Sequence, residues 1–141
     1  MRRFFLTALA GLALVSLAPA ASADVRVHID RSSQTMRVYV NGSLHGEWLV
    51  STGRRGYGTP GGTFRAQRLA RRWYSSKYNN TPMHNAIFFH GGYAIHATSY
   101  VSQLGRPASH GCVRLHPSHA AELYGLVEAY GRGRTRITIT R

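Results

Sequence analysis

The chain has 141 residues, of which 43% are hydrophobic, and it carries a formal net charge of +13 at pH 7. This length suits one domain with a single core, and we expect no separate binding module within it. The positive charge favours anionic partners, but seventeen of the eighteen basic residues are arginines scattered along the chain, so we predict no nucleic-acid-binding function.

The first segment has the organisation of a secretory signal peptide. Residues 2–3 are both arginine, residues 4–17 are almost wholly apolar, and residues 21–23 are the small residues that a signal peptidase recognises. An uncleaved membrane anchor is the alternative, but a spanning helix needs about 20 apolar residues and Pro19 ends this run. We therefore expect a signal peptide over residues 1–23, and export of the remainder to the periplasm or cell wall. A membrane would be contacted only through this transient segment.

The chain after the signal peptide begins with a pattern typical of β structure. Residues 25–29 and 36–40 alternate between apolar and polar side chains, which is the period of a half-buried strand. Asn41-Gly42 follows, and this dipeptide is the strongest short signal for a tight hairpin. Residues 44–51 are therefore predicted to return as the paired strand.

The middle of the chain is predicted to consist of loops and short strands. Residues 52–62 contain five glycines and a proline, which is typical of a long loop. A single strand is predicted over residues 63–69. Two more strands, over residues 85–89 and 93–97, are expected on either side of the turn His90-Gly91-Gly92.

One helix is predicted, over residues 117–130, with His116 or Ser118 as its cap and Gly131 as its end. Its apolar face would consist of Ala120, Leu123, Tyr124 and Val127. Residues 137–139 mark a closing strand. The predicted fold is therefore mainly β, a compact sandwich or barrel with one helix, forming a single domain over residues 24–141.

The single cysteine, Cys112, carries the strongest indication of chemistry. A free cysteine is most often a small buried hydrophobe, and one cysteine forms no intrachain disulfide in an oxidising exterior. Here, however, a histidine and a glycine precede it, and His96 lies sixteen residues upstream at the end of a predicted strand. This arrangement is typical of a thiol nucleophile and its base. A strand end facing a loop is also a common position for catalytic side chains.

The other histidines raise the possibility of a metal site. His116 and His119 are three residues apart at the predicted helix start, and the further zinc ligands could come from Cys112, His110 or His90. No H-E-x-x-H or paired-cysteine signature accompanies them, so we predict no metal and no cofactor. His84 and His90 flank an aromatic strand, and the sequence assigns no chemistry to either.

Several stretches, in a fixed order, resemble the L,D-transpeptidase catalytic domain family over essentially all of residues 24–141. In chain order they are Ser51-Thr52-Gly53 with Thr59-Pro60-Gly61-Gly62-Thr63-Phe64, then Pro82-Met83, Ile87-Phe88-Phe89 and Gly92-Tyr93-Ala94-Ile95-His96, and finally Ser109-His110-Gly111-Cys112-Val113-Arg114-Leu115. Two positions depart from the family's pattern. Ala97 stands where many members have glycine, and His84 stands where an aromatic ring is common.

The resemblance implies peptidoglycan cross-linking. Cys112 would attack the diaminopimelate carbonyl of a donor stem tetrapeptide, expel the terminal D-alanine, and pass the acyl group to the diaminopimelate amine of a second stem. His96 would act as base and then acid, oriented by the carbonyl of Ala97, and would lower the pKa of the thiol. The amides of His110, Gly111 and Cys112 would point at the oxyanion.

The same resemblance suggests substrate-binding residues. Arg114 would bind a substrate carboxylate as a bidentate fork, although an ordinary surface arginine is the alternative. Ser109 would support the nucleophile loop. Tyr93 and Tyr100 are aromatic candidates near the cleft, with ordinary packing as the alternative, and the His110 side chain would shape the pocket rather than serve as the base.

Two other functions stay open at this stage. Water could intercept the same acyl-enzyme, which would give an L,D-carboxypeptidase or an enzyme that cleaves cross-links. A non-catalytic wall-binding protein could also keep the same fold. In each case the expected partners are peptidoglycan stem peptides and the anionic cell envelope, to which positive charge would retain the protein.

Overall fold

The structure is a computed structural model that describes Val15 and residues 24–141, so the expected signal peptide and its cleavage site lie outside the described residues apart from Val15. In chain order the elements are β1 (Val25–Asp30), β2 (Thr35–Val40), β3 (Ser43–Ser51), β4 (Gly62–Arg65), β5 (Arg68–Ala70), β6 (Ala86–His90), β7 (Tyr93–Ala97), the 3₁₀ helix η1 (Val101–Gln103), β8 (Val113–Leu115), the helix α1 (Pro117–Tyr130), the 3₁₀ helix η2 (Arg132–Arg134) and β9 (Thr135–Thr140). The predicted mainly β fold with one α-helix is confirmed. No helix among the described residues is both long enough and apolar enough to cross a membrane.

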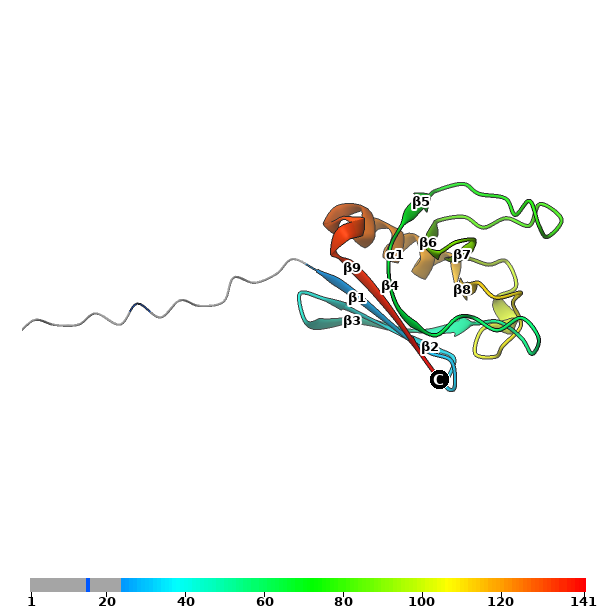
Figure 1. Ribbon diagram of the computed structural model, residues 1–141, viewed down its shortest axis with the longest axis horizontal. Helices are drawn as coiled ribbons and strands as arrows, with labels where there is room; N and C mark the ends of the chain where they lie inside the picture. Colours follow the sequence, from blue (N-terminus) through cyan, green and yellow to red (C-terminus); the bar gives the residue numbers. More distant parts are fainter. Residues whose placement is uncertain (1–14, 16–23) are drawn as a thin grey trace, which may run out of the picture.

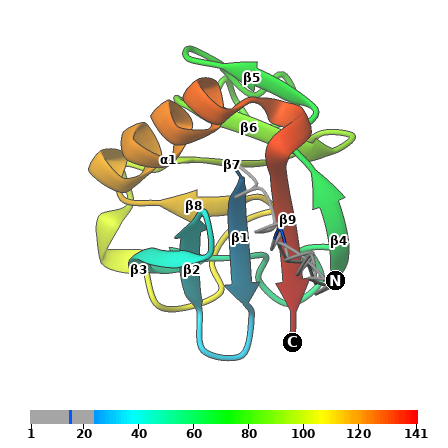
Figure 2. The same ribbon diagram turned by 90° about the vertical axis from the view of Figure 1, so that its left-hand side faces the viewer.

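The nine strands of the described chain form one sheet in the order β4-β9-β1-β2-β3-β8-β7-β6-β5. β1 runs parallel to β9 and β7 runs parallel to β8. β4 and β5 lie at opposite ends of this order, although only Ala66 and Gln67 separate them in the chain. So short a connection reaches about 11 Å, and the two outer strands must therefore lie close together. The sheet is curled on itself, as Figures 1 and 2 show.

The single strand predicted over residues 63–69 is wrong. β4 pairs with β9, whereas β5 pairs with β6 at the other end of the sheet. The change of partner falls between two adjacent residues, because the amide of Ala66 donates to Thr135 on β9 (3.4 Å) and that of Gln67 donates to Phe88 on β6 (2.8 Å). Closure of the sheet, a long-range requirement, divides what is locally one extended segment.

Local signals placed the hairpin and the helix correctly. Asn41 and Gly42 have φ angles of 49° and 81°, which are the two left-handed positions that a type I′ turn needs. α1 has the predicted limits, and His116 caps it by accepting a hydrogen bond from the amide of Ser118 (3.1 Å). β8 was not predicted as a strand, because its three residues are too few to show a period.

The alternation of side chains along β7 divides the interior into two apolar clusters. Ile95 points into the main core, which lies within the curled sheet and includes the apolar face of α1. Ala94, its neighbour, points to the opposite face of the same strand and packs in a smaller cluster with Met83, Ala86 and Phe88. Figure 2 shows α1 running beside β6 and β7. The candidate site lies on the face of β7 and β8 that is turned away from α1 and the main core.

Candidate active site

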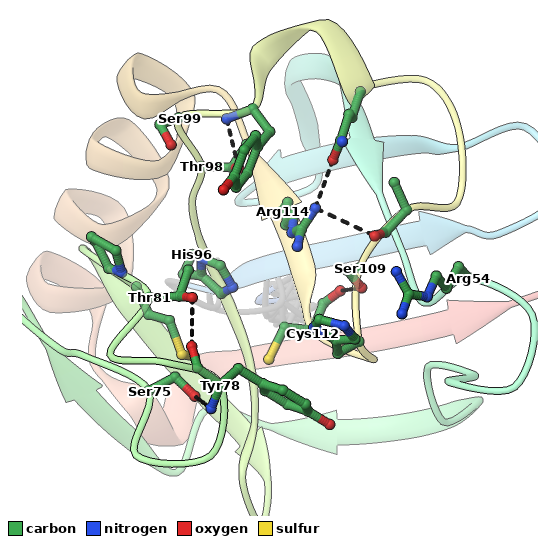
Figure 3. A pocket seen from close by; sticks show the side chains of 16 residues that line it. Arg54, Ser75, Tyr78, Thr81, His96, Thr98, Ser99, Ser109, Cys112 and Arg114 are labelled. Carbon is green, nitrogen blue, oxygen red and sulfur yellow. Dashed lines mark hydrogen bonds between the residues drawn. The ribbon is translucent and has the colours of Figure 1, made fainter.

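A cleft of about 340 Å³ contains both His96 and Cys112 (Figure 3). One wall comes from the loop between β5 and β6 and consists of Ser75, Tyr78, Thr81, Pro82 and Met83. The opposite wall comes from the chain around η1 and consists of Thr98, Ser99, Tyr100, Gln103 and Ala108. Two chain segments far apart in the sequence therefore enclose the nucleophile candidate.

The parallel pairing of β7 and β8 brings the histidine and the thiol together. His96 lies opposite Arg114 in this register. Cys112 precedes Arg114 by two residues, so these two side chains leave the strand on the same face. All three line the cleft, and in Figure 3 the ring of His96 and the sulfur of Cys112 both point into it.

His96 is held as a neutral imidazole of defined tautomer. Its side chain is 5% exposed, and Nδ1 donates to the carbonyl oxygen of Ala97 at 2.7 Å. The pKa of His96 is lowered to about 4, chiefly by burial; the charges of Arg114 and His84 act in the same direction, and the Ala97 carbonyl opposes them. The proton on Nδ1 leaves Nε2 with a lone pair that can accept a proton. Because the backbone supplies this contact, alanine in place of glycine at position 97 does not remove it.

The thiol of Cys112 is also neutral in the free protein, which corrects the expectation of a lowered pKa. Burial raises the pKa of this thiol above its usual value, although the amide of Ala94 and the charge of Arg114 oppose the shift. The thiol donates a long hydrogen bond of 3.9 Å to the carbonyl of Gly92. An imidazole with a pKa near 4 carries no charge at neutral pH, so His96 does not stabilise a thiolate. Proton transfer must therefore accompany nucleophilic attack.

Ser109 stabilises the turn before Cys112 through two hydrogen bonds within that turn. Its hydroxyl accepts from the amide of Gly111 (3.0 Å) and donates to the carbonyl of Cys112 (2.6 Å). The Gly111 amide, predicted to point at the oxyanion, therefore already has an acceptor in the structure. The amides of His110 and Cys112 are the remaining candidates. Gly111 itself is required, because it has a φ of 124° and a Cβ there would lie 2.6 Å from the ring of Tyr93.

Tyr93 lies outside the cleft. It alternates with Ala94 along β7 and packs against the main core, with its ring against Gly111 and stacked on His90 at a centroid distance of 6.2 Å. The interpretation of Tyr93 as a substrate contact is therefore wrong, and packing, the alternative, describes its position. Tyr100, the other aromatic candidate, does line the cleft.

Arg114 is a half-buried part of the cleft rather than an ordinary surface arginine. Its Nη1 donates to Oε1 of Gln103 (2.9 Å) and to the carbonyl of Ala108 (3.4 Å). Its guanidinium carbon lies 5.6 Å from the centre of the Tyr100 ring. One nitrogen of the Arg114 guanidinium is therefore bound to the η1 wall of the cleft. The guanidinium lies in the same cleft as His96 and Cys112.

The imidazole of His110 packs between Tyr78 of the cleft wall and Tyr57 of the loop before β4. It stacks on Tyr78 with ring centres 4.2 Å apart and planes 13° apart, and it meets the edge of Tyr57 at 5.0 Å. His110 thus lines the cleft, the position from which it was expected to shape the pocket. Tyr78 was missed by sequence reasoning, because nothing in its loop indicates which residues fold back over the nucleophile.

Two of the remaining histidines, His119 and His84, pack against aromatic rings. His119 stacks on Trp48 with ring centres 4.7 Å apart, and His84 meets the edge of Tyr74 at 5.4 Å while its carbonyl accepts from the amide of Ala97 (2.9 Å). Within residues 24–141 no three His, Cys, Asp or Glu side chains come together in a way that could hold a metal ion.

A buried hydrogen-bond network connects Gln34 and Thr52 to the loop that carries Cys112. Gln34, which is 3% exposed, accepts from the amide of Thr52 (2.9 Å) and donates to its hydroxyl (2.7 Å). The carbonyl of Thr52 accepts from the amides of Ala108 and Ser109 (3.0 Å each). The turn after β1 is thus connected to the loop that carries Cys112. A glutamine in a turn gave no sign of this role in the sequence.

Thr59 makes a second connection to the loop that carries Cys112. Its hydroxyl, in a side chain 2% exposed, donates to the carbonyl of Gly111 (2.7 Å) and accepts from the amide of Gly53 (2.9 Å). Thr59→Val keeps the shape but leaves two buried polar groups without partners, so the free energy of unfolding should fall by about 2–4 kcal/mol. Urea denaturation measures this change. Thr63→Val, at an exposed position on β4, should change it by less than about 0.5 kcal/mol.

Comparison with known proteins identifies the family. The family profile described as the L,D-transpeptidase catalytic domain (YkuD) matches residues 24–139, whereas no curated protein matches the chain. Among solved structures the chain is similar to an L,D-transpeptidase from Mycobacterium smegmatis, with 24% identity and a TM-score of 0.75 over 84% of this chain and 59% of that one.

Two further solved structures show the same likeness. An L,D-transpeptidase from Xylanimonas cellulosilytica is 27% identical, with a TM-score of 0.70 over 86% of this chain and 63% of that one. The L,D-transpeptidase LdtMt1, solved in complex with imipenem, is 25% identical, with a TM-score of 0.74 over 82% of this chain and 58% of that one. The chain thus spans less than two thirds of each of these solved chains. The profile, however, extends over nearly all of residues 24–141, and the chain belongs to the L,D-transpeptidase catalytic domain family.

Proposed function

We propose that this protein is a peptidoglycan L,D-transpeptidase that forms an acyl-enzyme on Cys112. The observation that supports this most directly is the joint placement of Cys112, His96 and Arg114 on one face of two adjacent parallel strands, inside one cleft. A nucleophile, a proton acceptor and a cation then share the space in which a peptide carbonyl would react. Export to the periplasm or cell wall, where this substrate occurs, is part of the same proposal.

Acylation would begin from two neutral groups. As the sulfur of Cys112 bonds to the diaminopimelate carbonyl carbon of a stem tetrapeptide, its proton moves to Nε2 of His96. The amides of His110 and Cys112 would donate to the oxyanion, an interaction worth about 3 kcal/mol for each donor. The hydrogen bond from Nδ1 to the Ala97 carbonyl supports this step, because it holds the ring and stabilises the imidazolium.

The tetrahedral intermediate would then collapse with loss of D-alanine. The carbon–nitrogen bond breaks, and the leaving amine takes the proton from Nε2 of His96. A thioester to Cys112 results. The amine of a second stem attacks this thioester and gives a proton to His96, which returns it to the departing sulfur. The product is a cross-link, and the free enzyme is restored.

Incubation with purified disaccharide-tetrapeptides, followed by mass spectrometry, tests the function itself. A transpeptidase is expected to release D-alanine and to produce dimers. Release of D-alanine with tripeptide as the main product would instead assign hydrolysis, since water would be the acceptor. The absence of any D-alanine release would contradict both activities and favour a wall-binding role.

A further inference from the structure

The charged side chains that line the cleft are all positive. Among the described residues that line it, Arg54 and Arg114 carry charge at neutral pH, and none is an aspartate or a glutamate. The cleft therefore presents two guanidinium groups and no internal counterion. A neutral peptide would leave both charges uncompensated, whereas a ligand with two anionic groups would pair with both.

Arg54 is held at the cleft by the nucleophile loop itself. Its amide donates to the carbonyl of Ser109 (3.0 Å), next to a parallel bridge between Gly53 and Ser109. Its carbonyl accepts from the amide of Tyr57 (2.8 Å), and its guanidinium carbon lies 4.8 Å from the centre of the Tyr57 ring. The backbone admits no side chain at Gly53, where a Cβ would lie 1.8 Å from the carbonyl oxygen of Tyr57. The sharp turn thus directs Arg54 toward Cys112, as Figure 3 shows.

The two arginines differ in depth and in distance from the proton acceptor. Arg114 is half-buried, is fixed by Gln103, and lies opposite His96 across the strand pair. Arg54 is exposed at the rim, on the other side of Ser109. The amine that leaves during acylation must meet His96, so the carboxylate of the same leaving residue falls within the range of Arg114. Arg54 is then available to a second anionic group of the donor.

The charge of Arg54 also changes the pKa of neighbouring groups in the cleft. The field of Arg54 lowers the pKa of the His110 imidazole and of the Arg114 guanidinium, in addition to the larger effect of burial on both. Repulsion between guanidinium groups near one nucleophile is unfavourable in the empty cleft. A dianionic donor would relieve it, which gives the pair a physical reason to discriminate between donors.

We propose that Arg54 is a specificity-determining residue that binds the side-chain carboxylate of the donor diaminopimelate, while Arg114 binds the terminal carboxylate of the leaving D-alanine. This inference rests on the proposed function, since it names how that site selects its donor. The preferred donor then carries both carboxylates free, and amidation of the diaminopimelate side chain weakens it.

Two tetrapeptide donors that differ only in this amide test the inference. For the wild-type protein, kcat/KM for D-alanine release should be about fivefold higher with the free carboxylate than with the amide. Arg54→Gln should lower kcat/KM for the free acid by about the same factor and leave the amidated donor nearly unchanged, so that the ratio approaches one. The matched control is Arg55→Gln, which removes the same charge from a neighbouring residue that does not line the cleft and should keep the ratio.

A preference for the free acid that is retained in Arg54→Gln would overturn the inference, as would an equal loss of preference in Arg55→Gln. Calorimetric titration of Cys112→Ala with both donors separates this result from a failure of the proposed function. If the wild-type protein turns over neither donor, tighter binding of the free acid that depends on Arg54 still supports the inference. Equal binding of both donors contradicts it.

Discussion

Replacing Cys112 with serine is expected to abolish D-alanine release, with kcat reduced by more than about 10³-fold. A serine hydroxyl is a far weaker acid than a thiol. The base available to it is weak as well, because burial holds the pKa of His96 near 4. The substitution changes one atom in a half-buried side chain, so the free energy of unfolding should hardly change. Steady-state assays with stem tetrapeptides, together with urea denaturation, measure both quantities.

Covalent labelling gives this prediction a readout that is independent of turnover. If Cys112 forms an acyl-enzyme as proposed, the strained β-lactam carbonyl of a carbapenem should acylate it, visible as an increase in intact mass. Cys112→Ala is the control and should show no increase. A mass increase retained in that variant would exclude Cys112 as the acylated residue. Unchanged cellular function of the same variant would favour the non-catalytic alternative.

The parts of the fold that sequence reasoning placed well are those specified by local interactions. The Asn41-Gly42 turn needs two left-handed residues, and the apolar face of α1 repeats with the helical period, so a short window contains all the information needed. The separation of β4 from β5 has no such signal. It depends on where β6 and β9 lie, and those strands are distant in the sequence.

In the candidate site, too, features specified locally were predicted and features that depend on long-range contacts were not. Cys112 and His96 were selected from their chemical type and their order in the chain, and the structure brings both into one cleft. The assignment of Tyr93 failed because the face on which a strand residue lies depends on register, and a step of one residue reverses it. The cleft wall that contains Tyr78 comes from the loop between β5 and β6, whose path depends on contacts with His110.

Ionisation was the least predictable property of the site. A cysteine near a histidine suggests a thiolate paired with an imidazolium, which would lower the pKa of the thiol. Burial acts on both groups in the opposite sense, since it disfavours the charged form of each. The pKa of Cys112 rises and that of His96 falls. The extent of burial depends on the packed structure and is not visible in the motif.

Substitution of His96 with alanine is expected to leave a folded protein that is nearly inactive, because Cys112 then has no proton acceptor. For the wild-type protein, the acid limb of kcat/KM should fall near pH 4 rather than near 6.5, since His96 must be neutral to act as a base and burial lowers its pKa to about 4. Activity that fell with an apparent pKa close to 6.5 would contradict this assignment. His96→Gln, which keeps an amide donor for the Ala97 carbonyl, should be as inactive as the alanine variant if proton transfer is the essential role.

The same depressed pKa of His96 predicts how stability depends on pH. In the unfolded chain this imidazole takes a proton near pH 6.5, whereas in the folded protein it stays neutral down to about pH 4. Between these values the unfolded state binds more protons, so the free energy of unfolding falls as the pH falls, by about 3 kcal/mol for this residue. Urea denaturation between pH 7 and pH 4 should therefore show a shallower decline for His96→Ala than for the wild-type protein. Parallel declines in the two proteins would mean that the pKa of His96 is the same in the folded and unfolded states, which would contradict the buried imidazole of lowered pKa described above.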